Sequence, residues 1–307
     1  MLADIQKGVF SWLPSVVQGE LSRNCPVGVN KFDLTLYGGE SLTFDQLEKT
    51  RLIRKLFWQG IEGHEPNTLR TFYALARHAR MVFDVGAFFG LYGMVAAKAN
   101  ELAEIHCFEP FPDNVQLMDH LLDLNALVNV NSHQVAVSDS SGDATFFVPK
   151  GKGKRLPDIG SVKNRFDSGR FADREFSTID VAAITLDGFC EQQGIEHVDL
   201  MKIDVEECEL QVLEGAVDLL HRSKPDIICE VVFGNSQIPK IEEILTPLGY
   251  QYYVMEKHCL LRADGLDSYK DDGRQSRKGG YSDRLLSTRP EDELRHLLDW
   301  IKRDRSN

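Results

Sequence analysis

A glycine-rich turn and an acidic residue further along the chain form the pattern that says most about chemistry. The turn is Asp84-Val-Gly86-Ala-Phe-Phe-Gly90, and Glu109 lies 23 positions after Gly86 at the end of the apolar run 104–110. Glycine at position 86 permits a tight turn and lets a ligand approach the backbone closely. A carboxylate at position 109 can accept hydrogen bonds from both hydroxyls of a ribose. We therefore predict a nucleoside-binding site.

The charge of this turn distinguishes between two kinds of nucleoside. A dinucleotide cofactor favours a GxGxxG turn whose N–H groups hold a pyrophosphate. Here the glycines stand at positions 86, 90 and 93, and Asp84 brings negative charge to the turn. S-adenosylmethionine has no phosphate and carries a sulfonium and an ammonium group, so Asp84 favours it as the ligand. The sequence predicts S-adenosylmethionine as the cofactor.

The elements that must position these residues follow an alternation of apolar runs and amphipathic segments. Repeated βα units of this kind predict an α/β fold, with a mostly parallel sheet covered by helices on both faces. Ligands bind at the carboxyl ends of the strands in such sheets. We expect seven strands, at 81–87, 104–110, 130–139, 198–205, 225–233, 250–256 and 284–288.

Three segments lie outside this alternation. Residues 1–80 are predicted to form a helical N-terminal extension, and residues 291–307 a C-terminal helix. The domain between them, 81–290, contains an insertion at about 140–186 that we expect to be partly β-strand and partly loop.

The ordered motifs resemble the FkbM-type methyltransferase family. This resemblance implies a Rossmann-like class I methyltransferase fold and S-adenosylmethionine-dependent O-methylation of a sugar, glycan or secondary metabolite. The segments that carry it are VFDVGAFFGLYGMVAA (82–97), HCFEPFPDNVQLM (106–118), VAVSDSSGDATFFV (135–148), ITLDGF (184–189), MKIDVEECELQVLEGA (201–216) and IICEVV (227–232).

Carried over by position, the resemblance assigns parts of the cofactor to residues of this chain. The methionine part falls to the turn 84–90, the ribose to Glu109 and the adenine edge to 136–138. This chain departs from the family pattern at Phe88, where a small polar residue is usual, at Glu207, where glycine is usual, and at Cys208, where alanine is usual. The complete expected cofactor set is Asp84, Gly86, Ala87, Phe88, Gly90, Glu109, Pro110, Asn114, Ala136, Val137, Ser138 and Asp204.

Three acidic residues are the candidates for catalysis. An alcohol is almost wholly protonated at neutral pH, so a base would assist its attack on a methyl group. Asp204, Glu206 and Glu230 stand at or just after predicted strand ends, and Asp204 is the first choice. Glu206 also opens a predicted helix, where a carboxylate is favoured on structural grounds alone. A divalent metal held by these carboxylates is an alternative, although no ligand spacing in the sequence identifies one.

Charge and hydropathy restrict the partners. The net charge of −12 over 307 residues disfavours a nucleic-acid substrate. Two stretches are nevertheless basic: 150–174 has eight Lys and Arg against three Asp, and 269–289 has six against three. We hypothesise a lid, including Lys152, Lys154 and Arg155, that attracts an anionic acceptor. No window approaches the roughly 18 apolar residues of a membrane-spanning helix, and the N-terminus is a poor secretory signal, so we expect a cytoplasmic protein.

Other functions remain open at this point. A nicotinamide-dependent oxidoreductase on a related fold is opposed by the acidic turn. An N-methyltransferase often carries an (N/D)PPY-type segment after the fourth strand, where this chain has DVEE (204–207). A module that binds S-adenosylmethionine without turnover is the third alternative, and Glu207 is the residue that supports it. The acceptor and the oligomeric state are not fixed by the sequence.

Overall fold

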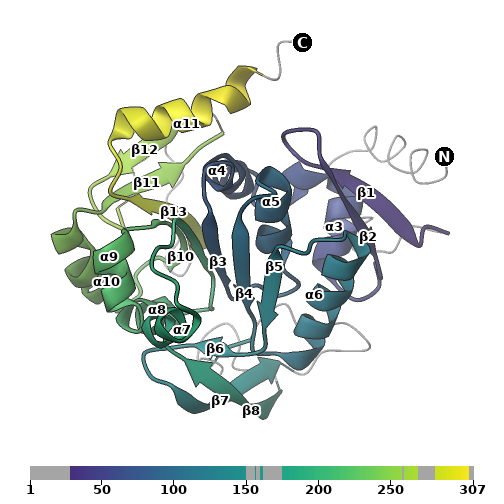
Figure 1. Ribbon diagram of the computed structural model, residues 1–307, viewed down its shortest axis with the longest axis horizontal. Coiled ribbons are helices and arrows are strands. Elements are labelled where there is room, and N and C mark those ends of the chain that lie inside the picture. The colour runs from purple at the N-terminus through teal and green to yellow at the C-terminus, as the bar shows by residue number, and fades with distance from the viewer. Residues whose placement is uncertain are drawn as a thin grey trace.

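One large sheet forms the centre of the protein (Figure 1). The computed structural model describes residues 28–149, 156, 160–161, 175–257, 259–268 and 281–303, and within them eight strands make up this sheet. Their order is β12-β11-β13-β10-β9-β3-β4-β5. In chain order the strands are β3 (Met81–Val85), β4 (Glu104–Phe108), β5 (Val130–His133), β9 (Leu200–Ile203), β10 (Asp226–Val232), β11 (Gln251–Met255), β12 (Leu260–Ala263) and β13 (Tyr281–Ser287).

The pairing of these strands confirms the predicted Rossmann-like α/β fold. Strands β5, β4, β3, β9 and β10 pair in parallel, while β13 runs antiparallel to both β10 and β11. Seven strands match the predicted ones, and β12 adds an eighth by pairing antiparallel with β11. The chain winds outward from β3 to β5 and then continues on the other side of β3 with β9. The carboxyl ends of β3 and β9 therefore border the switch point where ligands bind in sheets of this kind.

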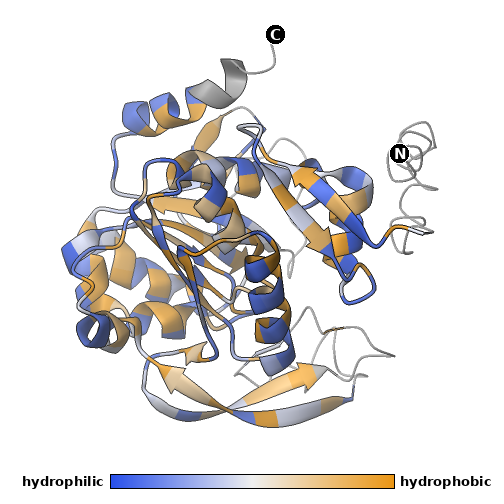
Figure 2. Ribbon diagram, turned by 45° about the vertical axis from the view of Figure 1, so that its right-hand side comes forward, coloured by the Kyte–Doolittle hydropathy of each residue, from blue (hydrophilic) through white to orange (hydrophobic). Residues whose placement is uncertain are grey.

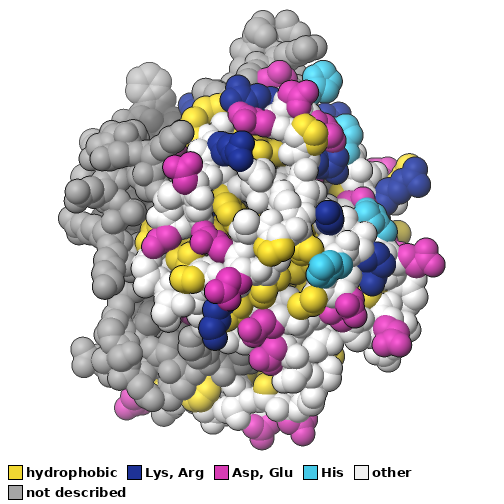
Figure 3. Space-filling model, turned by 90° about the vertical axis from the view of Figure 1, so that its left-hand side faces the viewer, with side chains coloured by type: hydrophobic (Ala, Val, Ile, Leu, Met, Phe, Trp, Pro, Cys, Tyr) yellow, Lys and Arg dark blue, Asp and Glu magenta, His cyan; other side chains and the backbone are white. Residues whose placement is uncertain are grey.

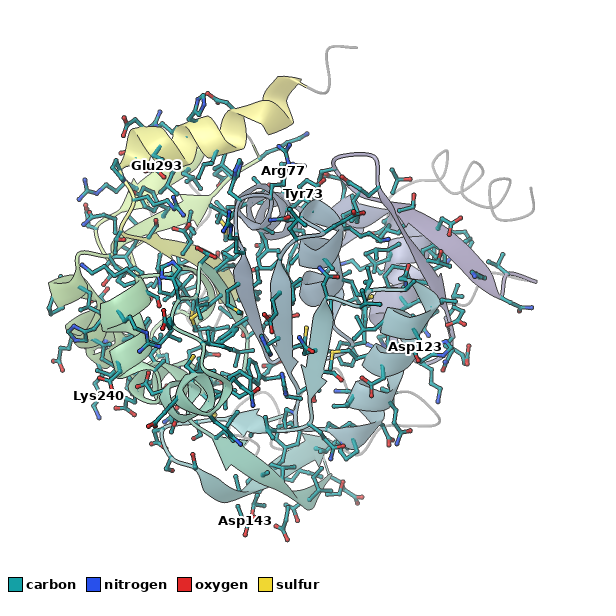
Figure 4. All side chains as sticks on the ribbon, in the orientation of Figure 1. Tyr73, Arg77, Asp123, Asp143, Lys240 and Glu293 are labelled. Atoms are coloured by element: carbon teal, nitrogen blue, oxygen red, sulfur yellow. The ribbon has the colours of Figure 1, made fainter. Side chains whose placement is uncertain are left out.

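Helices cover both faces of the sheet, as the alternation predicts. Two separate apolar cores lie between the helices and the sheet, and Figure 2 shows apolar strands between helices whose outer faces are hydrophilic. In Figure 4, Asp123 and Lys240 extend outward from opposite sides of the molecule. The first face carries α4 (Pro66–Ala76), α5 (Leu91–Ala99) and α6 (Pro112–Leu124); the second carries α7 (Leu186–Gln193), α8 (Glu209–Glu214), α9 (Val217–Ser223), α10 (Ile238–Leu245) and the 3₁₀ turn η3 (Thr246–Leu248).

The N-terminal extension differs in part from the helical prediction. Helix α3 (Arg51–Gln59), the 3₁₀ turn η1 (Ile61–Gly63) and α4 are helical, but β1 (Lys31–Thr35) and β2 (Ser41–Asp45) form an antiparallel hairpin. The helical prediction is thus wrong for residues 31–45. Every second residue of both strands is buried, a period of two that only a strand satisfies.

Two strands from the insertion and one that precedes it form a second, smaller sheet, below the first in Figure 1. Its strands, in the order β6-β8-β7, are β6 (Ala136–Val137), β7 (Gly142–Pro149) and β8 (Phe176–Ile184). The single strand expected at 130–139 is therefore two strands. The chain turns after β5, where the Val135 N–H donates to the His133 carbonyl, and the Ser138 N–H then donates to Ile184 of β8.

The structure describes only part of the two basic stretches, 150–174 and 269–289. Lys152, Lys154 and Arg155 lie outside the described residues, as does 269–280. In the described part of the second stretch, Arg284 is fully buried in β13 and Arg289 donates to Asp226 over 2.8 Å. Arg284 is part of the sheet and Arg289 is paired with Asp226, so the charge of 281–289 does not form a basic loop.

The C-terminal helix α11 (Glu291–Arg303) packs against α4 and buries Leu294. On the face in Figure 3, acidic and basic side chains of the described residues are interspersed. Across the part of the chain that the structure describes, every helix is too short or too polar to cross a membrane.

Candidate active site

A cavity of about 400 Å³ lies at the carboxyl ends of β3, β4, β9 and β10. Its volume is within the range of small-molecule sites. The predicted residues that line it are Asp84, Gly86, Ala87, Phe88, Glu109, Pro110, Asn114, Ala136, Val137, Asp204, Glu206 and Glu230. The structure thus brings together ten of the twelve expected cofactor residues and all three catalytic candidates.

Gly90 and Ser138 are the two expected residues that do not line the cavity. Gly90 begins α5 in a left-handed conformation (φ 79°), and its Cα faces Met118. The Ser138 carbonyl packs closely against Gly215, and its hydroxyl donates to Asp139. Both residues shape the backbone around the cavity.

Two independent features of the structure favour glycine at position 86. Its φ of 81° is in the left-handed region, which residues with a Cβ rarely adopt. A Cβ built on it would also overlap the carbonyl oxygen of Asp204. The turns after β3 and β9 therefore touch at this point, which fixes the floor of the cavity.

Asp84 is buried beneath the turn, and its Oδ2 accepts the Gly93 N–H over 3.0 Å. Burial raises its pKa to about 7, while the N–H donor and nearby Lys202 oppose the rise. Asp84 thus fixes the first turn of α5 and also lines the cavity.

Glu109 is held by three donors. Its Oε2 accepts the Phe88 N–H over 2.9 Å, and its Oε1 accepts the Phe111 N–H over 2.9 Å and the Asn114 amide over 3.2 Å. Burial raises its pKa to about 7, and the three donors favour the ionised form. A carboxylate has about four acceptor positions, so Oε2 retains one for a further donor, and Glu109 lines the cavity.

The acidic end of the cavity contains a buried lysine that the sequence argument did not single out. Lys202 Nζ lies 3.1 Å from Asp204 Oδ2 and 2.9 Å from Asp283 Oδ1, and its side chain is 1% exposed. The two carboxylates raise the pKa of Lys202 well above its usual value despite burial. Asp204 is therefore oriented by a cation that remains charged at neutral pH.

Glu230 is a buried carboxyl group among other acidic side chains. Burial, followed by the charges of Asp204 and Glu206, raises its pKa to about 10. Its buried Oε2 has no hydrogen-bond partner among the described residues. At neutral pH Glu230 is consequently a hydrogen-bond donor rather than a base.

A metal has little support in this part of the molecule. Within the described residues, no group of three or more His, Cys, Asp or Glu side chains is placed to hold one. The positive charge facing these carboxylates comes from Lys202.

Comparison with known proteins identifies the family. The sequence profile described as "Methyltransferase FkbM domain" matches residues 84–252, more than half of the chain. The chain belongs to the FkbM methyltransferase family. The protein is therefore a methyltransferase.

The sequence identity to individual relatives is low. The chain is 29% identical over 192 residues to methyltransferase sdnD of Sordaria araneosa, covering 55% of this chain and 73% of that protein. It is 26% identical over 149 residues to the 2-O-methyltransferase NoeI of Sinorhizobium fredii, covering 47% and 60%. The crystal structure of methyltransferase FkbM from Methylobacillus flagellatus has a TM-score of 0.42 at 16% identity, with 68% of this chain and 43% of that chain covered.

The structure shows the backbone conformation and burial at the positions where the chain departs from the FkbM family pattern. Glu207 has a φ of 73°, a left-handed conformation that explains why glycine is usual there. Glu206 beside it has a φ of 57°, and Phe88 has 55°. Cys208 is buried, with its Sγ 3.4 Å from the Ser161 hydroxyl. The departures at Phe88 and Glu207 are accommodated at the cost of strained backbone beside the cavity, whereas Cys208 has an ordinary φ of −113°.

Several lining residues were missed at the sequence level. Arg51 and Lys55 of α3, His64 and Glu65 before α4, and Tyr92 of α5 all line the cavity. Only Lys202 had a recognisable signal, because a charged residue inside a buried strand requires a partner. The others come from the N-terminal segment and from a helix interior, where no local pattern marks them.

Proposed function

We propose that this methyltransferase transfers the methyl group of S-adenosylmethionine to a hydroxyl of a sugar, glycan or secondary metabolite. The observation that carries the proposal is the cavity beside the turn 84–90, which six Asp and Glu residues line against three Lys and Arg, and where three donors fix the Glu109 carboxylate. A cationic, phosphate-free nucleoside suits this cavity better than a dinucleotide does. The relative NoeI is a 2-O-methyltransferase, which supports oxygen as the methylated atom.

The described residues fit such a cofactor. The turn 84–90 would hold the methionine part, Glu109 the ribose, and Ala136 and Val137 the adenine edge. Asn114 Oδ1 is buried without a partner among the described residues and lies at the cavity, so it can accept an N–H group. When bound, S-adenosylmethionine would supply the electrophilic methyl group.

The role of the protein is to orient the acceptor. Positioning an oxygen in line with the methyl–sulfur bond accounts for much of the rate of such a displacement. Lys202 holds Asp204 in one orientation, and Asp204 can accept the acceptor's O–H. The protonated Glu230 can donate to another acceptor oxygen, a pairing that favours a polyol over an isolated alcohol.

Binding measurements test the cofactor. We would titrate the full chain with S-adenosylmethionine, S-adenosylhomocysteine and NAD by calorimetry, and expect micromolar binding of the first two alone. Binding of NAD alone would overturn the proposal in favour of an oxidoreductase. The Asp204→Asn variant should lose methyl-transfer rate far more than affinity for S-adenosylmethionine. A non-catalytic binding module would show no methyl transfer even in the wild type.

Acceptor chemistry needs a separate measurement. We would measure transfer of a radiolabelled methyl group to a panel of glycosides, nucleotide sugars and polyketide alcohols. Matched amino sugars in the same panel would detect methylation of nitrogen instead of oxygen. The anionic-acceptor hypothesis rests on the undescribed residues Lys152, Lys154 and Arg155. Neutralising all three should raise the KM of a charged acceptor and leave cofactor affinity unchanged. Cytoplasmic location and the domain boundaries stay predictions.

A further inference from the structure

His64 and Glu65 reach the cavity from the N-terminal segment, not from the sheet. They lie between η1 and α4, and both line the cavity. Glu65 has a φ of 40°, directly before Pro66. A left-handed conformation is costly for a residue with a Cβ, and such strain persists where surrounding contacts hold it and often marks functional sites.

The contacts that hold this pair connect it to the centre of the cavity. The Tyr92 hydroxyl donates to Glu65 Oε2 over 2.7 Å, and His64 Nε2 lies 3.5 Å from the same oxygen. The Tyr92 ring lies 5.3 Å from Lys202 Nζ, the cation that orients Asp204. One continuous chain of contacts therefore joins the imidazole to the acidic end of the cavity.

The carboxylates at the acidic end of the cavity are constrained by their surroundings. Burial raises the pKa of Glu230 to about 10, and Asp204 Oδ2 is held by Lys202. Burial lowers the pKa of His64 to about 4, aided by the charges of Lys55 and Lys202 and opposed by Asp283. Burial raises the pKa of Glu65 to about 7. His64 is consequently a neutral imidazole at pH 7, with a nitrogen lone pair available.

We propose that His64 is the general base of the methyl transfer and that Glu65 is its positioning residue; the inference rests on the proposed function. The acceptor oxygen gives a lone pair to the methyl carbon as the carbon–sulfur bond breaks, and the bonding pair stays on sulfur. The hydroxyl proton passes to a ring nitrogen of His64. It then leaves to solvent, to which the His64 side chain is 22% exposed.

A weak base is sufficient for this step. The oxygen becomes positively charged as its bond to carbon forms, and the proton of a protonated ether is strongly acidic. A base that stays unprotonated in the resting enzyme is therefore useful even when its pKa is low. The Glu65 carboxylate lies 3.5 Å from the ring, and because its pKa is the higher of the two it can take the proton on from the imidazolium.

The rate test uses His64→Gln, with His221→Gln as the matched control. His221 is an exposed histidine of α9, away from the cavity. With the best acceptor of the panel above, we expect His64→Gln to lose about 100-fold in single-turnover rate and to keep its S-adenosylmethionine affinity within about twofold. The control should match the wild type. A loss of less than threefold, or an affinity loss as large as the rate loss, overturns the proposal.

The protonation test needs no acceptor. In the full chain labelled with ¹⁵N-histidine, the resonance missing from His64→Gln identifies His64, and we expect a neutral ring at pH 7. An imidazolium at pH 7 contradicts the role of base. The Glu65→Gln variant should slow transfer about tenfold and remove the titration near pH 7 from the pH–rate profile, whereas a merely structural Glu65 would leave the shape of that profile unchanged.

The two proposals fail differently. A wild-type protein that binds S-adenosylmethionine but methylates nothing in the panel counts against the proposed function and against this inference. An active wild type with an equally active His64→Gln variant contradicts only the role of His64.

Discussion

Replacing Lys202 with methionine tests how far the acidic end of the cavity depends on one buried cation. Its ammonium group contacts both Asp204 and Asp283, and methionine has a similar length without the charge. The substitution therefore keeps the packing of β9 and leaves two carboxylates uncompensated.

The structure sets the expected size of the effect. Removing one partner of a buried ion pair costs about 3–5 kcal/mol, because the remaining charge is left without compensation. Asp283 is 8% exposed and Asp204 is 29% exposed. The Thr68 hydroxyl still donates to Asp283. We therefore expect a loss near the lower limit, about 3 kcal/mol, which for a chain of this length corresponds to roughly 5 °C in Tm.

Urea unfolding of three variants measures this loss. Lys202→Met is compared with Lys240→Met, whose side chain projects from α10 (Figure 4) and which should stay within about 0.5 kcal/mol of the wild type. The double variant Lys202→Met/Asp283→Asn should recover at least half of the loss, because it removes the more deeply buried unpaired charge. A loss below 1 kcal/mol, or no recovery in the double variant, would refute the reasoning.

Three other changes test separate contacts. Glu109→Gln should weaken S-adenosylmethionine binding about 10- to 100-fold, because hydrogen bonds to a charged group contribute about 1.5–3 kcal/mol; an unchanged Kd in calorimetry would contradict the ribose role. Gly86→Ala should destabilise the fold by more than 3 kcal/mol, since strain and backbone overlap add, whereas Gly39→Ala (φ 94°, nothing within 4 Å) should lose only the strain, about 1–2 kcal/mol. Equal losses of unfolding free energy for Gly86→Ala and Gly39→Ala in urea would show that the overlap with the Asp204 backbone contributes nothing. Burial raises the pKa of Glu209 to about 7 from 4.5, so the stability that its protonated form provides is lost as pH rises through 7. Glu209→Gln should remove on the order of 2–3 kcal/mol of this pH dependence, and a matching change in the exposed Glu214→Gln control would contradict the assignment.

Local patterns in the sequence were sufficient to predict residues that line one end of the cavity. A buried strand must end in a turn, and the conformations at Gly86 and Gly90 favour glycine, so these positions are visible without the rest of the fold. Glu109 was predictable for the same reason, because its place depends only on the next strand. The parallel sheet followed from the βα alternation, since the period of the apolar residues differs between strands and helices.

Local patterns were misleading where the signal was short. The hairpin 31–45 has only five residues in each strand, too few to outweigh the helical periodicity of the rest of the N-terminal segment. The strand expected at 130–139 was divided because β6 pairs with β8, which is more than 40 positions away along the chain. Pairing over such a distance leaves no trace in neighbouring residues.

The sequence by itself determined the fold class, the glycine turn, the strand-end glutamate and the family. Only the tertiary structure decided which carboxylate is protonated, that Lys202 pairs with Asp204 and Asp283, and that His64 and Glu65 line the cavity. The physical reason is the same in each case. The conformation of a turn depends on its own residues, whereas a pKa and an ion pair depend on burial and on charges from distant segments.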